Sequence, residues 1–127
     1  MNGFTLIELL IVMVILGLLA SLVAPTMFSK VDSSKRNTAV AQMQMLATSL
    51  DAFRLDVGRY PDRLEELRSS DRRGWDGPYL PREIPLDPWG TPYIYRMPGS
   101  SEAYDLLSFG ADGVEGGEGD NADILHK

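Results

Sequence analysis

The sequence predicts an α+β fold, in which a long N-terminal helix packs on a small antiparallel β-sheet that is followed by an acidic, glycine-rich loop. Three observations support this prediction. Residues 4–24 form a nearly continuous apolar run, and an apolar stripe at three- and four-residue steps continues beyond it. Two short runs of strand-forming residues then flank a turn.

Length and composition limit what else the chain can be. Its 127 residues leave room for one small domain beside the apolar run, and such domains often need a disulfide, a metal or a partner. There is no cysteine, so a metal or assembly remains. The net charge of -6 argues against nucleic-acid binding through a broad basic face.

The apolar run over residues 4–24 is long enough to cross a bilayer as a helix, which takes about 20 residues. A cleaved secretory signal would have a shorter apolar core and a basic start, and residues 1–3 contain no Lys or Arg. A plain membrane anchor fits the length but leaves Glu8 unexplained, because an acid inside a bilayer is costly unless it is paired.

The stretch GFTLIELLIVMVILGLLASLVAP resembles the N-terminus of type IV pilins and of the pseudopilins of type II secretion. The resemblance implies that a prepilin peptidase cuts between Gly3 and Phe4, leaving residues 1–3 as the leader, and that the new Phe4 amine is methylated. It also implies that Glu8 pairs with the Phe4 amine of a neighbouring subunit, which fixes the register of a filament. Pro25 matches the helix-breaking proline of the family.

The orientation of the chain rests on the resemblance. Leaders in this family are usually basic and longer than residues 1–3, so we expect the natural leader to be longer. The nearest basic residues follow the apolar run, and the positive-inside rule alone would place the rest of the chain in the cytoplasm. The resemblance implies instead an inner-membrane helix over residues 4–24, the core of the filament after assembly, and a periplasmic pilin-like domain over residues 25–127.

One helix is predicted over residues 5–56, kinked or locally melted at Pro25 and stopped by Gly58. Its buried stripe is predicted to consist of Val40, Met43, Leu46, Ala47, Leu50, Phe53 and Val57. A second, short helix should follow, with Asp62 and Glu65 at capping-box spacing and two leucines, Leu64 and Leu67, facing the long helix.

The remaining segments favour loops and strands. Residues 71–85 are rich in Gly and Pro and should form a loop held by Trp75 and Tyr79. The sequence DPWG at residues 87–90 suits a type I turn. The runs TPYIYR and AYDLLSF on either side of PGSSE predict an antiparallel hairpin, to which a short third strand can be added.

Taken in order, the stretches GRYP, GWDGPYL, DPWGTPYIY, YDLLSFGADG and EGGEGDNADI resemble the major, G-type pseudopilins of type II secretion over nearly the whole chain. Major type IV pilins share the N-terminus but commonly close their C-terminal loop with a disulfide, which a chain without cysteine cannot form. The expected fold is therefore type IV pilin-like.

Residues 108–124 contain five glycines and five acids, and this composition is compatible with a disordered tail or with a cation site. The spacing of an EF-hand is absent. The resemblance implies a calcium (Ca²⁺) site with Asp112 and Asp123 as carboxylate ligands and Asp120 as a less certain third. Phe109 and Val114 are chosen as backbone carbonyl ligands. A loop ordered only by neighbouring subunits is the alternative.

No nucleophile with a base, phosphate loop or dinucleotide fingerprint is present, so we expect no enzyme. The resemblance implies a subunit that polymerises with itself into the periplasmic pseudopilus and thereby drives export of folded proteins across the outer membrane. The implied partners are minor pseudopilins, the inner-membrane assembly platform, the prepilin peptidase and the membrane before assembly. The alternatives are a type IV major or minor pilin for adhesion, motility or DNA uptake, and a monomeric membrane-anchored calcium-binding module.

Overall fold

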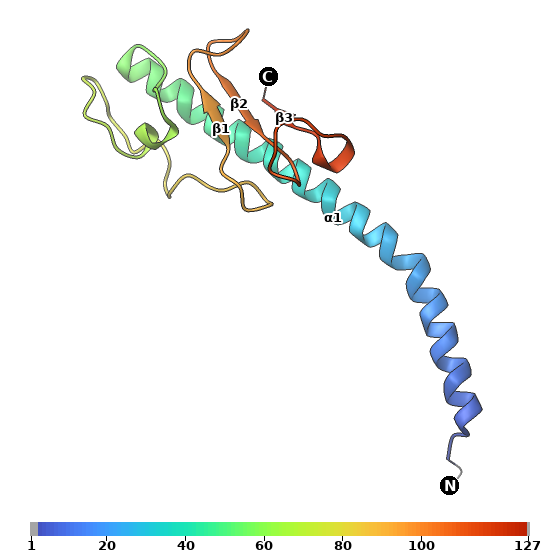
Figure 1. The fold of residues 1–127 in the computed structure, drawn as a ribbon. Helices are drawn as coiled ribbons and strands as arrows, with labels where there is room; N and C mark the ends of the chain where they lie inside the picture. Colours follow the sequence, from blue (N-terminus) through green and yellow to red (C-terminus); the bar gives the residue numbers. More distant parts are fainter. Residues whose placement is uncertain (1–2, 127) are drawn as a thin grey trace. The chain divides into compact units, whose positions relative to one another are not determined.

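The computed structural model describes the backbone of residues 3–126 and their side chains except those of residues 25–29. In chain order the elements are α1 (Leu6–Val57), the 3₁₀ turn η1 (Leu64–Leu67), β1 (Ile94–Arg96), β2 (Asp105–Ser108), the 3₁₀ turn η2 (Gly119–Asn121) and β3 (Ile124–Leu125) (Figure 1). The chain divides into two compact units on either side of the Ser34–Lys35 bond, and the second unit holds the sheet and the core. The predicted division at Pro25, between membrane and periplasm, stays a prediction.

The helix α1 confirms the predicted long helix and continues through Pro25. It ends where Gly58 adopts a φ of 95°, a left-handed conformation that glycine takes without steric cost, while the Gly58 amide still donates to the Arg54 carbonyl at 2.8 Å. The predicted stop is therefore confirmed.

The buried stripe of α1 lies largely where it was predicted. Its buried members are Ala39, Met43, Leu46, Ala47, Leu50 and Phe53, and Val57 packs at the edge. The prediction for Val40 was wrong, because this side chain is 53% exposed. Successive helix residues differ by about 100° around the axis. Since Ala39 lies on the buried line, Val40 points away from it.

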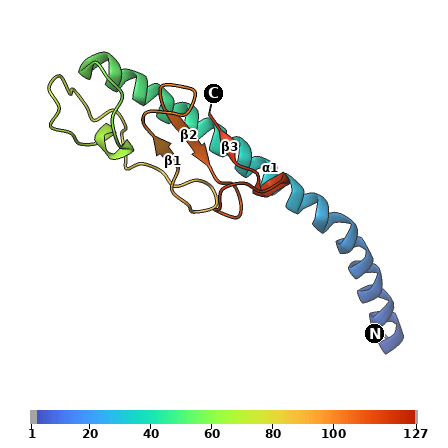
Figure 2. The same cartoon turned by 45° about the horizontal axis from the view of Figure 1, so that its top comes forward.

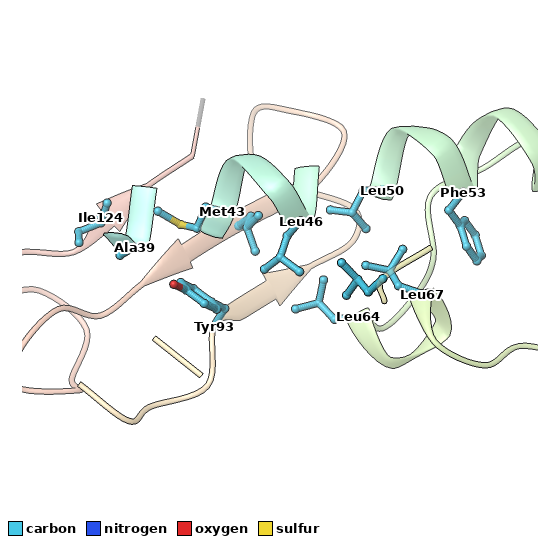
Figure 3. Close-up of a cluster of buried hydrophobic side chains, with 11 residues drawn as sticks. Ala39, Met43, Leu46, Leu50, Phe53, Leu64, Leu67, Tyr93 and Ile124 are labelled. Atoms are coloured by element: carbon cyan, nitrogen blue, oxygen red, sulfur yellow. The ribbon is translucent and has the colours of Figure 1, made fainter. Parts of the chain in front are cut away.

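The three strands form one antiparallel sheet in the order β1-β2-β3, which confirms the predicted hairpin and its third strand. Ile94 pairs with Leu107 between β1 and β2, and Ser108 pairs with Ile124 between β2 and β3. The sheet lies along the C-terminal part of α1 (Figure 2). Its inner face contributes Leu106 and Ile124 to a core that also contains Tyr93, Leu64 and Leu67 (Figure 3). The two predicted helix-facing leucines are thus buried.

The predicted second helix is only the single 3₁₀ turn η1, and its predicted cap was wrong. The turn begins after Arg63, not after Asp62. The acid whose side chain caps the start of the turn is Glu66, not Glu65. The Glu66 carboxylate accepts hydrogen bonds from the backbone N–H of Asp62 at 2.7 Å and of Arg63 at 3.4 Å. The reason is burial: Glu66 is 8% exposed, and Glu65 points to solvent.

An ion-pair cluster surrounds Glu66. Arg72 donates through Nε to the Glu66 carboxylate and through Nη2 to Asp62 at 2.8 Å, and Asp62 also pairs with Arg59 at 2.7 Å. Burial of Glu66 raises its pKa, but the hydrogen bonds from Arg72 and from the two backbone N–H groups outweigh burial. The pKa of Glu66 consequently lies below its ordinary value.

The Gly/Pro-rich loop beyond η1 is held by its aromatic residues, as predicted. The Trp75 indole N–H donates to the Glu66 carbonyl at 2.8 Å, and the Tyr79 hydroxyl donates to Asp56 at 2.7 Å. Tyr79 also packs edge-on against Phe53, with ring centroids 5.7 Å apart. In the following DPWG turn, the Gly90 amide donates to the Asp87 carbonyl at 2.9 Å, as the predicted turn requires.

Candidate functional site

The N-terminal segment places Phe4 and Glu8 at the start of a capped helix. The Thr5 hydroxyl accepts the Glu8 backbone N–H at 3.2 Å, which satisfies one of the free donors of the first turn. Phe4 is 89% exposed, and the Glu8 side chain is exposed. Gly3 precedes them, whereas the rest of the predicted leader, Met1 and Asn2, lies outside the described residues. The predicted cleavage and methylation stay predictions.

The apolar side chains that follow have no partner within the described chain. Those of residues 6–23 are exposed, and Leu6–Ala24 is long and apolar enough to cross a membrane, judged by length and composition alone. Exposed apolar surface of this extent is typical of a segment that contacts a membrane or another protein. Glu8 is the one carboxylate within it.

The acidic loop, residues 109–123, connects β2 to β3 and includes η2. Its backbone turns at glycines with positive φ, and two of these also allow close approach of the chain. A Cβ on Gly110 would lie 2.6 Å from the Ala122 carbonyl oxygen, and one on Gly117 would lie 2.5 Å from that of Asn121. The loop therefore closes on itself in a way that requires glycine at these two positions. It is folded between two strands in this structure.

The two predicted carboxylate ligands both accept hydrogen bonds from the loop backbone. Asp112 accepts the Val114 N–H at 3.1 Å, and Asp123 accepts the Gly116 N–H at 3.0 and 3.2 Å. Asp120, the third predicted ligand, takes part through its carbonyl oxygen, which accepts the Ala111 N–H at 3.1 Å. The carboxylates of Asp112 and Asp120 are exposed, and Asp123 is half-buried.

Within residues 3–126, no three or more acidic or histidine side chains are grouped so that they could hold a metal ion by themselves. An ion in the acidic loop would depend on backbone oxygens as well as on carboxylates. The donors that the loop offers are carboxylate and carbonyl oxygens on a glycine-bent backbone, and Phe109 directly follows β2 while Val114 lies next to the Asp112 carboxylate. Such oxygen donors fit a hard divalent cation such as calcium.

Arg36 holds the C-terminal end of the acidic loop and was missed by sequence reasoning. Its guanidinium Nη1 donates to the Ala122 carbonyl at 3.1 Å and to the Asp120 carbonyl at 3.4 Å. The partners in these two contacts are separated by 86 and 84 positions in the sequence, so no local sequence pattern indicates the contacts. Ser108, predicted only as a strand residue, accepts the Gly110 N–H of the loop, and Asp87, predicted only as a turn residue, accepts the Ser108 hydroxyl.

Comparison with protein-family models gives two matches. Residues 26–127 match the model of type II secretion system protein G, and residues 1–24 match the prokaryotic N-terminal methylation motif. The first match covers the whole of the second compact unit, including the acidic loop, and the second covers the apolar segment with Glu8.

Curated relatives and a solved structure agree with these matches. The chain is 40% identical to the type II secretion system core protein G of Pseudomonas aeruginosa, over 97% of this chain and 92% of that protein. It is 39% identical to the protein of the same name from Vibrio cholerae, over 97% and 89%. The crystal structure of the major pseudopilin from the type 2 secretion system of enterohaemorrhagic Escherichia coli superposes with a TM-score of 0.65 at 32% identity, covering 76% of this chain and 85% of that one. The chain therefore belongs to the type II secretion system protein G family, and the predicted pilin-like fold is confirmed.

Proposed function

We propose that the chain is the structural subunit that polymerises into the periplasmic pseudopilus, and that assembly of this filament drives folded proteins across the outer membrane. The observation that carries the proposal is the exposed apolar helix of residues 6–23 joined to a folded domain. In the inner membrane lipid covers this helix, and in the filament the helices of other subunits cover it. The domain of residues 25–127 then lies in the periplasm.

Glu8 is proposed to set the register of the filament. After cleavage behind Gly3, the Phe4 amine stands just before the capped first turn of α1 and carries a positive charge near neutral pH. A buried carboxylate and a buried amine are each costly alone, whereas the pair compensates. The Glu8 carboxylate of one subunit therefore favours the one axial position that brings the Phe4 amine of a neighbour to it. The prepilin peptidase, the minor pseudopilins and the assembly platform are the proposed partners.

The test is pseudopilus assembly by the full chain in cells, with Glu8→Ala as the variant. Because removal of one partner of a buried ion pair costs about 3–5 kcal/mol, filaments are expected to disappear while the subunit still reaches the membrane and is cleaved. Ser21→Ala is the matched control, since the Ser21 hydroxyl is satisfied within its own helix by the Leu18 carbonyl at 2.7 Å. Normal filaments from Glu8→Ala would refute the register role.

We further propose that the acidic loop binds calcium through the carboxylates of Asp112 and Asp123, with Asp120 as a third carboxylate and the carbonyls of Phe109 and Val114. Bound calcium would supply two positive charges to a segment whose five acids otherwise repel one another. The residues of the loop orient the oxygen atoms that would bind the ion. Asp112 and Asp123 orient their carboxylates by accepting backbone N–H groups, and the glycines allow the carbonyls to turn inward.

A further inference from the structure

We propose that Asp87 and Ser108 are positioning residues of the acidic loop: they fix its first turn from outside the loop. Asp87 is 3% exposed although it is a carboxylate, and its bonds extend beyond its own turn. Its Oδ1 accepts the backbone N–H groups of Thr91 at 2.7 Å and Trp89 at 3.2 Å. Its Oδ2 accepts the Ser108 hydroxyl at 2.8 Å.

Ser108 links Asp87 to the loop, because its hydroxyl bonds to both. The residue is fully buried at the end of β2, and its Oγ accepts the Gly110 N–H at 3.2 Å while its own proton goes to Asp87. Both hydrogen-bonding roles of the hydroxyl are thus in use. Because neither group reaches water, loss of one partner leaves the others unsatisfied.

Gly110 is the residue at which the two ends of the loop meet. Its φ is 80°, and a Cβ there would lie 2.6 Å from the Ala122 carbonyl oxygen, just before Asp123. The hydrogen bond from the Gly110 amide to Ser108 therefore keeps the first turn of the loop close to the end of the loop that carries Asp123. Thr91, directly after the DPWG turn, lies close to the loop at a second point, since a Cβ on Gly113 would lie 3.3 Å from the Thr91 hydroxyl oxygen.

These contacts join the turn of residues 87–91 and the acidic loop into one structural unit, although neither Asp87 nor Ser108 is a proposed calcium ligand. A loop closed in advance loses less conformational freedom when it binds an ion or a neighbouring subunit. The consequence for loop order does not depend on calcium, whereas the consequence for calcium affinity rests on the proposed metal site.

The test compares Ser108→Ala with Ser49→Ala in the full chain in detergent micelles with a chelator present. Ser49 is a matched control because it is also buried, at 7% exposure, and its hydroxyl oxygen lies 3.1 Å from the Tyr79 carbonyl, away from the loop. Loss of the Ser108 hydroxyl is expected to accelerate amide hydrogen exchange at Gly110, Ala111 and Val114 about tenfold, with no such change in Ser49→Ala. Equal loop exchange in the two variants would overturn the proposal.

A conservative change at Asp87 separates positioning from a general loss of stability. In Asp87→Asn, Oδ1 can still accept both turn amides and the side-chain amide can donate to the Ser108 oxygen, whereas Asp87→Ala removes both links. The loop amides are expected to exchange more slowly in Asp87→Asn than in Asp87→Ala. Equal loss of protection in these two variants would contradict a role transmitted through Ser108.

The same samples separate this inference from the calcium proposal. When calcium is added, Ser108→Ala is expected to bind it about tenfold more weakly than Ser49→Ala. If the wild-type chain does not respond to calcium, the metal proposal fails, and the exchange rates in chelator still decide the role of Asp87 and Ser108. If both serine variants bind calcium, and bind it with equal affinity, this result would contradict the claim that the Ser108 contact closes the loop before the ion binds.

Discussion

Two long irregular segments of the domain, residues 58–86 and the acidic loop of residues 109–123, are stabilised in different ways. The first segment contains both signs of charge, and its central carboxylate, Glu66, is buried beside Arg72 and accepts several hydrogen bonds. The acidic loop contains five acids and no basic residue, and within the described part of the chain the hydrogen bonds of its carboxylates go to its own backbone. Among residues 3–126, the basic side chain that bonds to the loop is Arg36 on α1.

This difference shows where each segment obtains its order. The first segment supplies its own counter-charges and its own aromatic anchors, so it can fold within a single subunit. The acidic loop depends on groups outside its sequence: Arg36 at one end, the Asp87–Ser108 link at the other and, by our proposal, a cation between them. Removing charges should therefore have its largest effect on global stability in the first segment, and on local order in the second.

The largest effect is expected from Glu66→Gln, which removes the charge at the centre of the first segment. Loss of the charge-assisted bonds from Arg72 and the two backbone amides should lower the free energy of unfolding by about 2–3 kcal/mol. Thermal unfolding followed by tryptophan fluorescence measures it, since Trp75 and Trp89 both lie in the second unit. Glu65→Gln, next to it on the exposed side, should change stability by less than about 0.5 kcal/mol. Similar midpoints in the two variants would refute a central role for Glu66.

The pH dependence of the same variant gives a second test. Because the pKa of Glu66 is lowered in the folded chain, its contribution is fully present above the ordinary value of 4.5 and is lost as the pH falls through the lower folded value. The stability difference between the wild-type chain and Glu66→Gln should therefore be constant near neutral pH and shrink below pH 4.5. A difference that stays constant into strong acid would contradict the lowered pKa.

A smaller and local effect is expected from Arg36→Gln in the acidic loop. The change removes the guanidinium bonds to the Ala122 and Asp120 carbonyls, so amide exchange in residues 119–123 should accelerate about threefold to tenfold. The midpoint of global unfolding should move little. Lys35→Gln removes the same charge one residue away, and an equal effect of this control would show that Arg36 acts only through net charge.

The elements that local sequence determines were predicted well. The stripe through Met43, Leu46 and Leu50 repeats at helical spacing, and the DPWG turn has a residue at each position that favours it. The error at Val40 arose because periodicity gives the buried side of a helix only to within about one residue. The cap was assigned to Glu65 rather than Glu66 because spacing does not indicate which acid is buried.

Contacts between distant parts of the chain were not predictable from the sequence. Arg36 meets the acidic loop only because the sheet returns the loop to α1, and Ser108 meets Asp87 only because β2 ends beside the turn. A single basic residue on a helix and a single serine in a strand have no local signature of such contacts. The candidate ligands came from the family resemblance, and the structure adds the backbone bonds that orient Asp112 and Asp123.

The most direct test of the central claim, that a cation from outside the chain completes the acidic loop, is thermal unfolding of the full chain in detergent with calcium and with a chelator. At ten times a dissociation constant of about 0.1–1 mM, calcium should stabilise the domain by about 1.4 kcal/mol and raise the midpoint by several degrees. Asp112→Ala and Asp123→Ala should abolish the rise, while Glu118→Gln, a loop acid outside the proposed ligand set, should retain it. A midpoint that calcium leaves unchanged in the wild-type chain would contradict the claim.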